Sequence, residues 1–278
     1  FCCPGAMLRC VACASVAGLV SGELFCPGNA GDMNLEYGSV EFKNAGWVLN
    51  GGARVSSKTS WNLLGGHIEF DMDTSAVNAA VNTNLYTSSP AQANCGSSCY
   101  CDIQGCNDDS CPFCMEMDII ETNGNCLAQT TWHTIPNWDG APCDRGGCYA
   151  KMSISGKFHM VASFADDGWM SVTINGQENG GYSPAPTTDA AGVVASTMRG
   201  VGACIESSQW TGWVPGADQC AGGGDLGSSR VEISNVQVLG TVVQGPTPQM
   251  CSSQVTSGSF TPSAPVAPAP IPSASKVV

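Results

Sequence analysis

Residues 116–121, with the sequence EMDIIE, place three carboxylates in a short apolar run. Alternate side chains of a β-strand point to the same face, so Glu116 and Asp118 share a face. Glu121 follows Asp118 by three residues and therefore falls out of phase. One extra residue near positions 119–120, a β-bulge, would return Glu121 to the acidic face. The segment predicts a bulged strand with three acids on one side.

Ionised side chains seldom occur in an apolar strand unless they are paired, bind a metal or take part in chemistry. Glycoside hydrolysis uses two carboxyl groups on either side of the scissile bond, and Glu116 and Glu121 fit that requirement. Asp118, between them, could share a proton with Glu116 and help to keep Glu121 protonated. A solvated acidic strand or a calcium site is the alternative interpretation.

The spacing E-x-D-x-x-E resembles the motif of glycoside hydrolase family 16 (laminarinases and relatives) and of family 7 (fungal cellulases). The resemblance extends over about residues 60–240. Its further segments are GHIEF at 66–70, TWHT at 131–134, the F-H, D-G, V and N-G pattern of 158–176, and a closing strand at 230–239. Family 7 normally has Trp where this chain has Ile120, and its domain is longer, although residues 121–123, ETN, resemble its E-A-N. Within family 16, the six-residue motif with Met117 and Ile120 is closer to the bulged laminarinase branch than to the unbulged lichenases.

The resemblance implies an all-β fold, a concanavalin A-like β-jelly-roll sandwich of two antiparallel sheets. It implies that Glu116 is the nucleophile, Asp118 the assisting acid and Glu121 the general acid/base of a retaining mechanism. The expected substrate is β-1,3- or mixed-linkage β-glucan. No cofactor and no catalytic metal are expected. Clustered acids at residues 71–73 and 108–109 leave a structural calcium ion open.

Sugar rings stack on aromatic faces, while their hydroxyl groups meet polar side chains. Trp132 is the strongest candidate for such a platform, because it neighbours His133 on the strand expected beside the acids. His133 could bond the nucleophile or a sugar hydroxyl, although a lone histidine in a strand is often structural. The complete set of expected substrate-binding residues is Asn123, Trp132, His133, Trp138, Trp210 and Trp213.

Composition limits the remaining choices. With 34 Gly and 16 Pro in 278 residues, the chain suits one all-β domain, expected over residues 23–250. A formal net charge of -13 argues against nucleic acid or an anionic membrane as a partner. Residues 1–22 are interpreted as a signal peptide, and the Pro/Ser/Ala-rich residues 251–278 as a flexible tail. We expect a secreted monomer.

The 17 cysteines favour an oxidising compartment and disulfides. Six of them, between residues 95 and 114, are expected to crosslink an insertion next to the acidic strand, with a zinc or redox role as the alternative. Cys126, Cys143 and Cys148 are expected to crosslink loops on the other side. Cys251 either pairs with Cys26 or stays free.

Other functions remain open at this stage. A carbohydrate-binding or cell-wall protein could use the same fold without turnover, since a fold does not fix a function. A β-glucan transglycosylase would use the same acids but favour a sugar acceptor over water. A family 7-like cellulase would differ in glucan linkage. The intact set of three acids favours an enzyme.

Overall fold

The computed structural model describes residues 22–90, 115–134 and 140–252. The cysteine-rich insertion at 95–114, Trp138, the tail from residue 253 and nearly all of the expected signal peptide lie outside these residues. The strands are β1 Glu23–Phe25, β2 Met33–Lys43, β3 Gly46–Ala76, β4 Asn82–Ser88, β5 Glu116–Asn123, β6 Leu127–His133, β7 Cys148–Ser153, β8 Lys157–Phe164, β9 Met170–Ile174, β10 Gln177–Glu178, β11 Ala203–Trp210 and β12 Arg230–Gln244; the helix is α1 Thr188–Gly200.

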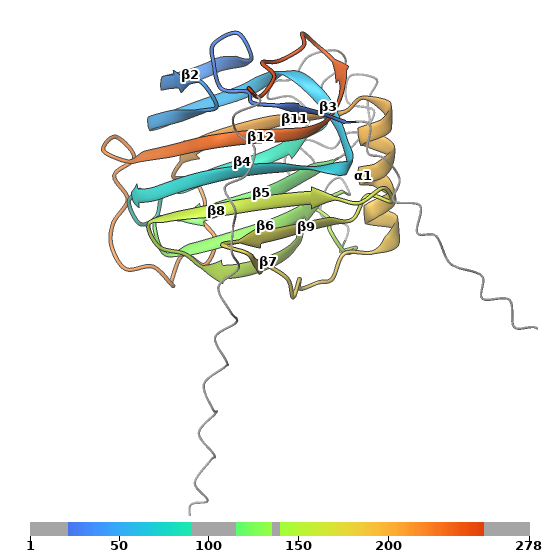
Figure 1. Ribbon diagram of the computed structural model, residues 1–278. Helices are drawn as coiled ribbons and strands as arrows, with labels where there is room; N and C mark the ends of the chain where they lie inside the picture. The colour runs from blue at the N-terminus through green and yellow to red at the C-terminus, as the bar shows by residue number, and fades with distance from the viewer. Residues whose placement is uncertain (1–21, 91–114, 135–139, 253–278) are drawn as a thin grey trace, which may run out of the picture.

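The chain is an all-β jelly-roll sandwich, as predicted (Figure 1). Strand β3 is 31 residues long and belongs to both layers. Its first arm pairs with β2 and β11, whereas its second arm pairs with β8. Hydrogen bonding therefore runs through both layers without a break, in the order β10-β9-β8-β3-β11-β4-β5-β6-β7. The two expected sheets are joined through this one bent strand.

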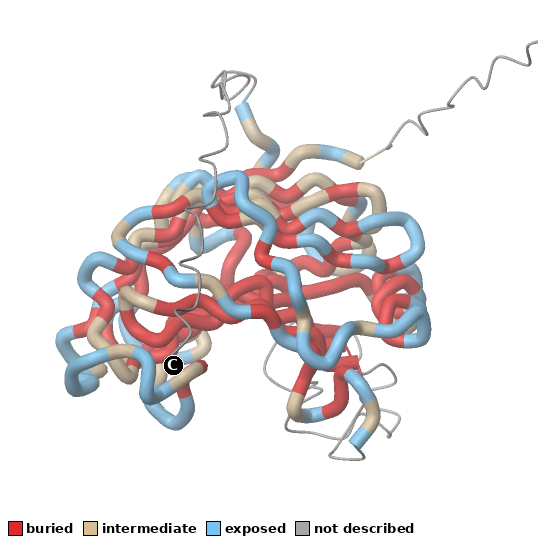
Figure 2. Tube along the Cα trace, turned by 90° about the horizontal axis from the view of Figure 1, so that it is seen from below, coloured by how far each residue is buried: buried red, intermediate tan, exposed pale blue. Residues whose placement is uncertain are grey.

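The hydrophobic core lies between the layers. From the second arm of β3 and from β8, alternate residues such as Phe70 and Met160 point inward. From the opposite layer, Leu85, Met117 and Trp132 meet them. Figure 2 shows buried positions along the strands and exposed positions gathered in the connecting loops. Because inward residues alternate with outward ones, each layer keeps an outer face for polar side chains.

Helix α1 was not predicted. The hydroxyl of Thr187 accepts a hydrogen bond from the Ala190 N–H and caps the helix. Buried Val194 and Met198 anchor the helix, which stands at one end of the strands (Figure 1). Gly168, in the turn between β8 and β9, lies so close that a Cβ atom there would meet the carbonyl oxygen of Ala191. Among the described residues, no helix has the length and apolar character needed to cross a membrane.

Disulfides close three of the described loops. Cys26 pairs with Cys251, which settles the alternative left open by the sequence. Cys126 pairs with Cys220, and Cys143 pairs with Cys148, so the expected loop crosslinks are confirmed. The first of these bonds joins the two ends of the folded domain.

Candidate active site

The predicted β-bulge is present in β5. Asp118 lies opposite Tyr86 of β4, but the next paired residue is Ile120, opposite Leu85. One residue of β5, Ile119, is therefore extra. The same offset occurs on the other side, where the step from Asp118 to Glu121 on β5 matches a step of two residues on β6. The bulge is the local feature that returns Glu121 to the face of the other two acids.

A side chain from the neighbouring strand holds this bulge. The hydroxyl of Thr130 donates to the carbonyl oxygen of Ile119 at 2.9 Å. The side-chain amide of Asn179 in turn donates to the Thr130 hydroxyl at 2.9 Å. The bulged residue, which loses ladder partners, thus gains a buried side-chain donor instead.

The three acids sit on the outer face of the layer. Glu116, Asp118 and Glu121 are 6%, 5% and 9% exposed, so each is largely withdrawn from solvent while remaining accessible. Met117 and Ile120, which alternate with them, are fully buried in the core. Sequence reasoning placed the acids on one outward face with apolar residues anchoring the strand, and the structure has this arrangement.

Glu121 has a defined hydrogen-bond donor. The side-chain amide of Asn82, on β4, donates from Nδ2 to Oε1 of Glu121 at 2.9 Å, and the contact is buried. This bond fixes the orientation of the carboxyl group.

Asp118 and His133 form a pair across β5 and β6. Nε2 of His133 lies 3.2 Å from Oδ2 of Asp118, and its Nδ1 lies 3.1 Å from the carbonyl oxygen of Asp144. A carbonyl oxygen only accepts, so Nδ1 carries a hydrogen. Contact between Nε2 and a carboxyl oxygen then requires one further proton, held on the imidazole or on Asp118. The pair is a proton-sharing unit next to the two glutamates.

A crosslinked loop orients His133. The disulfide between Cys143 and Cys148 closes the loop that carries Asp144. The Asp144 carboxylate accepts hydrogen bonds from the N–H groups of Gly140 and Gly146, at 3.0 and 2.7 Å, and so shapes the loop from within. At Gly147, with φ of +74°, a side chain would collide with the His133 ring.

A second charged cluster, which was not predicted from the sequence, lies across β4 from the acids. Glu206 of β11 is completely buried. Its carboxylate accepts hydrogen bonds from the Tyr86 phenol, the Ser88 hydroxyl and the Arg54 guanidinium. Arg54 also pairs with Glu36 at 2.9 Å. A buried carboxylate with three donors is a stable arrangement, because its charge and lone pairs are satisfied.

The ionisation of this cluster follows from its contacts. Burial, reinforced by the nearby Glu206 charge, raises the pKa of the Tyr86 phenol well above its usual value. Burial alone would lower the pKa of the Arg54 guanidinium, but Tyr86, Glu206 and Glu36 outweigh it and raise that pKa. Tyr86 therefore stays a hydrogen-bond donor and Arg54 stays charged. Together they form one side of the outer face that holds the acids.

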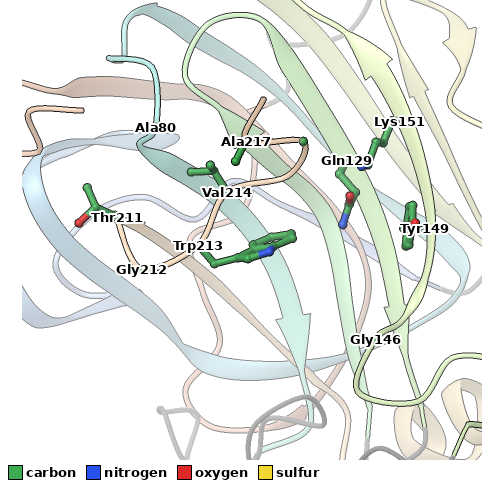
Figure 3. Close-up of a pocket in the computed structure, with 11 residues that line it drawn as sticks. Ala80, Gln129, Gly146, Tyr149, Lys151, Thr211, Gly212, Trp213, Val214 and Ala217 are labelled. Carbon is green, nitrogen blue, oxygen red and sulfur yellow. The ribbon is translucent and has the colours of Figure 1, made fainter. Parts of the chain in front are cut away.

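On the other side, over β6 and β7, lies a cleft of about 540 Å³ whose lining does not include the three acids. Gln129, directly opposite Glu121 in the ladder, lines it. Figure 3 shows Trp213 on the loop that forms one wall, and Gln129, Tyr149 and Lys151 on the strands that form the other. Trp213 is 47% exposed, so its indole is available for stacking.

The other expected sugar-binding residues are distributed differently. Trp132 is 1% exposed and packs in the core against Trp169 and Tyr182. This corrects the expectation that it forms a sugar platform: adjacent strand residues face opposite ways, so Trp132 cannot share the acid face with His133. Trp210 is half-buried beneath Gly212, where an added Cβ would touch its ring.

The expectation that Asn123 binds substrate is also corrected, because this residue has a structural role. It is 1% exposed, accepts a hydrogen bond from the Ala80 N–H at 3.0 Å, and donates to the carbonyl oxygen of Gly216 at 3.1 Å. Gly216 belongs to the loop of Trp213. Asn123 thus holds a wall of the cleft in place rather than facing it.

The acids at residues 71–73, for which the sequence left a calcium ion open, have partners within the protein. Asp71 accepts hydrogen bonds from His159 at 2.9 Å and from Asn235 at 2.8 Å, and Lys157 lies 3.5 Å away. Asp73 accepts a bond from the Ser75 N–H. Within the part of the chain that the structure describes, no group of three acids, histidines or cysteines is arranged to hold a metal ion.

Comparisons with known proteins give distant structural matches. An endocellulase from Humicola insolens overlaps at a TM-score of 0.48 with 16% identity, covering 71% of this chain and 76% of its own. A GH7 family cellobiohydrolase from Daphnia pulex overlaps at 0.48 with 13% identity, covering 71% and 79%. An endo-1,3-beta-glucanase (laminarinase) from Thermotoga petrophila overlaps at 0.49 with 12% identity, covering 77% and 92%. No protein-family model and no curated protein sequence matches the chain.

Proposed function

We propose that the chain is a secreted glycoside hydrolase that cleaves β-1,3- or mixed-linkage β-glucan with retention of anomeric configuration. The observation that carries the proposal is the bulge at Ile119, which brings Glu116, Asp118 and Glu121 to one outer face of the sandwich. Three carboxylates in one row on the same face, each nearly buried, fit general acid/base and nucleophilic chemistry at an acetal.

In the proposed first step, a carboxylate oxygen of Glu116 attacks C1 of the sugar. The C1–O bond to the leaving group breaks, and the leaving oxygen takes the proton from Glu121. Asn82 supports this role, because its hydrogen bond to Oε1 holds the Glu121 carboxyl group in a fixed orientation. In the second step, Glu121 takes a proton from water, and the water oxygen displaces Glu116 from C1. Protons and electron pairs balance over the two steps.

Asp118 and His133 serve the same reaction as a positioning pair. Their shared proton reduces the repulsion between Asp118 and the flanking glutamates, because it neutralises one charge in a row of three. The loop closed by Cys143 and Cys148 keeps the imidazole in place. Asp118 is thus assigned to tuning the two glutamates rather than to bond making.

The cleft lined by Gln129, the ladder partner of Glu121, suits a chain of neutral sugars. Trp213 offers an exposed aromatic face, and Gln129 and Tyr149 offer hydrogen-bonding groups on the opposite wall. We assign this cleft to sugar residues next to the scissile bond. The disulfides of the described residues support an extracellular location, because such bonds persist in oxidising environments.

The test is release of reducing sugar from laminarin, lichenan and cellulose by the wild type, Glu116→Gln and Glu121→Gln. We expect cleavage of at least one β-glucan, and a loss of at least about 1,000-fold in each variant. NMR of the first product should show the β-anomer, and azide should rescue Glu116→Ala. An initial α-anomer would exclude the assigned roles.

The rival functions give different outcomes in the same assay. Binding of all three glucans without cleavage would indicate a carbohydrate-binding protein. Longer products that accumulate when an oligosaccharide acceptor is added, with little free reducing sugar, would indicate a transglycosylase. Preference for cellulose would indicate a family 7-like cellulase.

A further inference from the structure

A second cleft, of about 530 Å³, lies on the other layer of the sandwich. Its lining includes His67 of β3, Ser163 of β8 and Ser171 of β9. These three residues are ladder neighbours, with His67 opposite Ser163 and Ser163 opposite Ser171. Their strand neighbours Ile68, Phe164 and Met170 point into the core. The row therefore lies on the outer face of the layer that turns away from the acids.

Trp169 gives this cleft an aromatic wall. It is 38% exposed, although a tryptophan in a folded domain is usually more deeply buried. On its inner side it packs against Trp132, with ring centroids 5.6 Å apart and an angle of 58° between the rings. Because a buried neighbour already holds the indole, a ligand that stacks on it would lose little side-chain entropy on binding.

Two glycines at the bend in β3 line the same cleft as the Trp169 indole and add no side chain to it. Gly65 has a φ of +72°, a conformation that favours glycine. At Gly66, a Cβ atom would lie 2.0 Å from the carbonyl oxygen of Leu239. Both glycines line the cleft. Gly66 is therefore required by the close packing of β3 against β12, and both glycines leave backbone rather than a side chain at this part of the cleft.

The lining carries no charged side chain, in a chain with a net charge of -13. Its polar side-chain groups are two hydroxyls, one imidazole and the indole N–H of Trp169. Burial lowers the pKa of His67, and the opposing effect of Glu69 does not cancel it. The imidazole is therefore neutral at neutral pH, with one donor and one acceptor nitrogen. From His67 to Ser171 the row crosses two strand spacings, about 10 Å.

We propose that this cleft is a second binding site, remote from the acids, for a neutral polysaccharide chain. A sugar ring stacks on Trp169, and its hydroxyl groups bond to Ser163, Ser171 and His67. Anionic polymers are disfavoured by the overall charge, and no cation is present in the lining to pair with them. The inference rests on the proposed function only for the choice of β-glucan as the probe.

Two variants and one control test the site, all in the full chain carrying Glu116→Gln so that the probe is not cut. Trp169→Ala removes the platform. Ser171→Leu fills part of the cleft without touching the core, and Thr173→Leu makes the same change two residues along the same outward face of β9. The probes are insoluble β-1,3-glucan and swollen cellulose, and the measurement is a depletion isotherm.

We expect Trp169→Ala and Ser171→Leu each to weaken adsorption about threefold to tenfold, and Thr173→Leu to leave it unchanged. If only Trp169→Ala lost adsorption, the inference would be overturned, because damage to the packing against Trp132 would explain the loss. Equal loss in Thr173→Leu, or no wild-type adsorption to either probe, would also overturn it. Adsorption that depends on Trp169 and Ser171, in a protein whose wild type cuts no glucan, would support the second site and refute the proposed function.

Discussion

The hydroxyl of Thr130 donates to the carbonyl oxygen of Ile119, the residue left without a place in the ladder between the two halves of β5. This single bond connects the core-facing side of β6 to the backbone distortion on which the acid row depends. Neither residue faces the acids, yet together they determine where Glu121 points.

Replacing Thr130 with Val should therefore reduce activity more than stability. Val keeps the branched shape but removes the donor, so the Ile119 carbonyl loses a buried hydrogen bond worth about 1–2 kcal/mol. We expect kcat to fall at least about tenfold while the unfolding free energy drops by that amount. Thr130→Ser, which keeps the hydroxyl, should restore most of kcat. If Thr130→Val had the same kcat as the wild type, the bulge would keep its shape without this hydrogen bond.

Loss of the disulfide between Cys143 and Cys148 should reduce kcat more than its small contribution to stability would suggest. Replacing both Cys143 and Cys148 with Ser opens only a short loop, which the chain-entropy relation values at about 2 kcal/mol. However, that loop supplies the carbonyl that orients His133. We expect a clear drop in kcat at a temperature where the variant remains folded, measured by initial rates alongside circular dichroism.

The matched control removes the disulfide between Cys26 and Cys251. The loop it closes is far longer, with a sequence separation of 225, and the same relation gives about 5 kcal/mol. This variant should lose more stability but keep the kcat of its folded fraction. If both double variants lost kcat equally, a specific role for the short loop would be excluded.

Trp213→Ala should weaken substrate binding without disabling the acids. The indole forms the wall of the cleft that faces Gln129, and stacking on a sugar contributes about 1 kcal/mol or more. We expect KM to rise about fivefold or more, with kcat changed less. Trp213→Phe should recover part of the loss because it keeps an aromatic face. Unchanged KM for Trp213→Ala would remove this cleft from the substrate path.

Acid should abolish the contribution of Asp71 to stability. Burial would raise the pKa of this carboxyl, but hydrogen bonds from His159 and Asn235 and the nearby Lys157 lower it below the usual value. Since the folded pKa is below the unfolded one, ionised Asp71 stabilises the fold at pH values above the unfolded pKa. That stabilisation is lost as the pH falls through the folded value.

Unfolding by denaturant at pH 7 and near pH 3 measures this effect. Asp71→Asn should be less stable than wild type at pH 7, and the difference should shrink near pH 3. Asp166→Asn, a change in the exposed turn between β8 and β9, provides the comparison. A difference between Asp71→Asn and wild type that stays constant with pH would assign the effect to packing.

The row of three acids was predictable because it depends only on the spacing of residues within one strand. The spacing of Glu116, Asp118 and Glu121 in an apolar strand required a bulge, and the position of that bulge followed from strand periodicity alone. The same rule would have prevented the error at Trp132. If His133 faces the acids, then its immediate neighbour must face the core.

The Glu206 cluster was not predictable in this way. Its members come from strands far apart in the chain, and Arg54 and Glu206 are separated by 152 positions. Only the order in which β3, β11 and β4 pair brings them together. Helix α1 was missed for a different reason. Small residues such as Ala190, Ala191 and Ala195 form much of its buried side, so its apolar periodicity is weak.

The bent strand β3 has a mechanical consequence. Its first arm carries Arg54 in the layer that holds the acids, and its second arm carries His67 in the other layer. Separating the two layers would break hydrogen bonds along both arms of β3, which is one continuous strand. The two layers therefore form one hydrogen-bonded scaffold beneath the connecting loops.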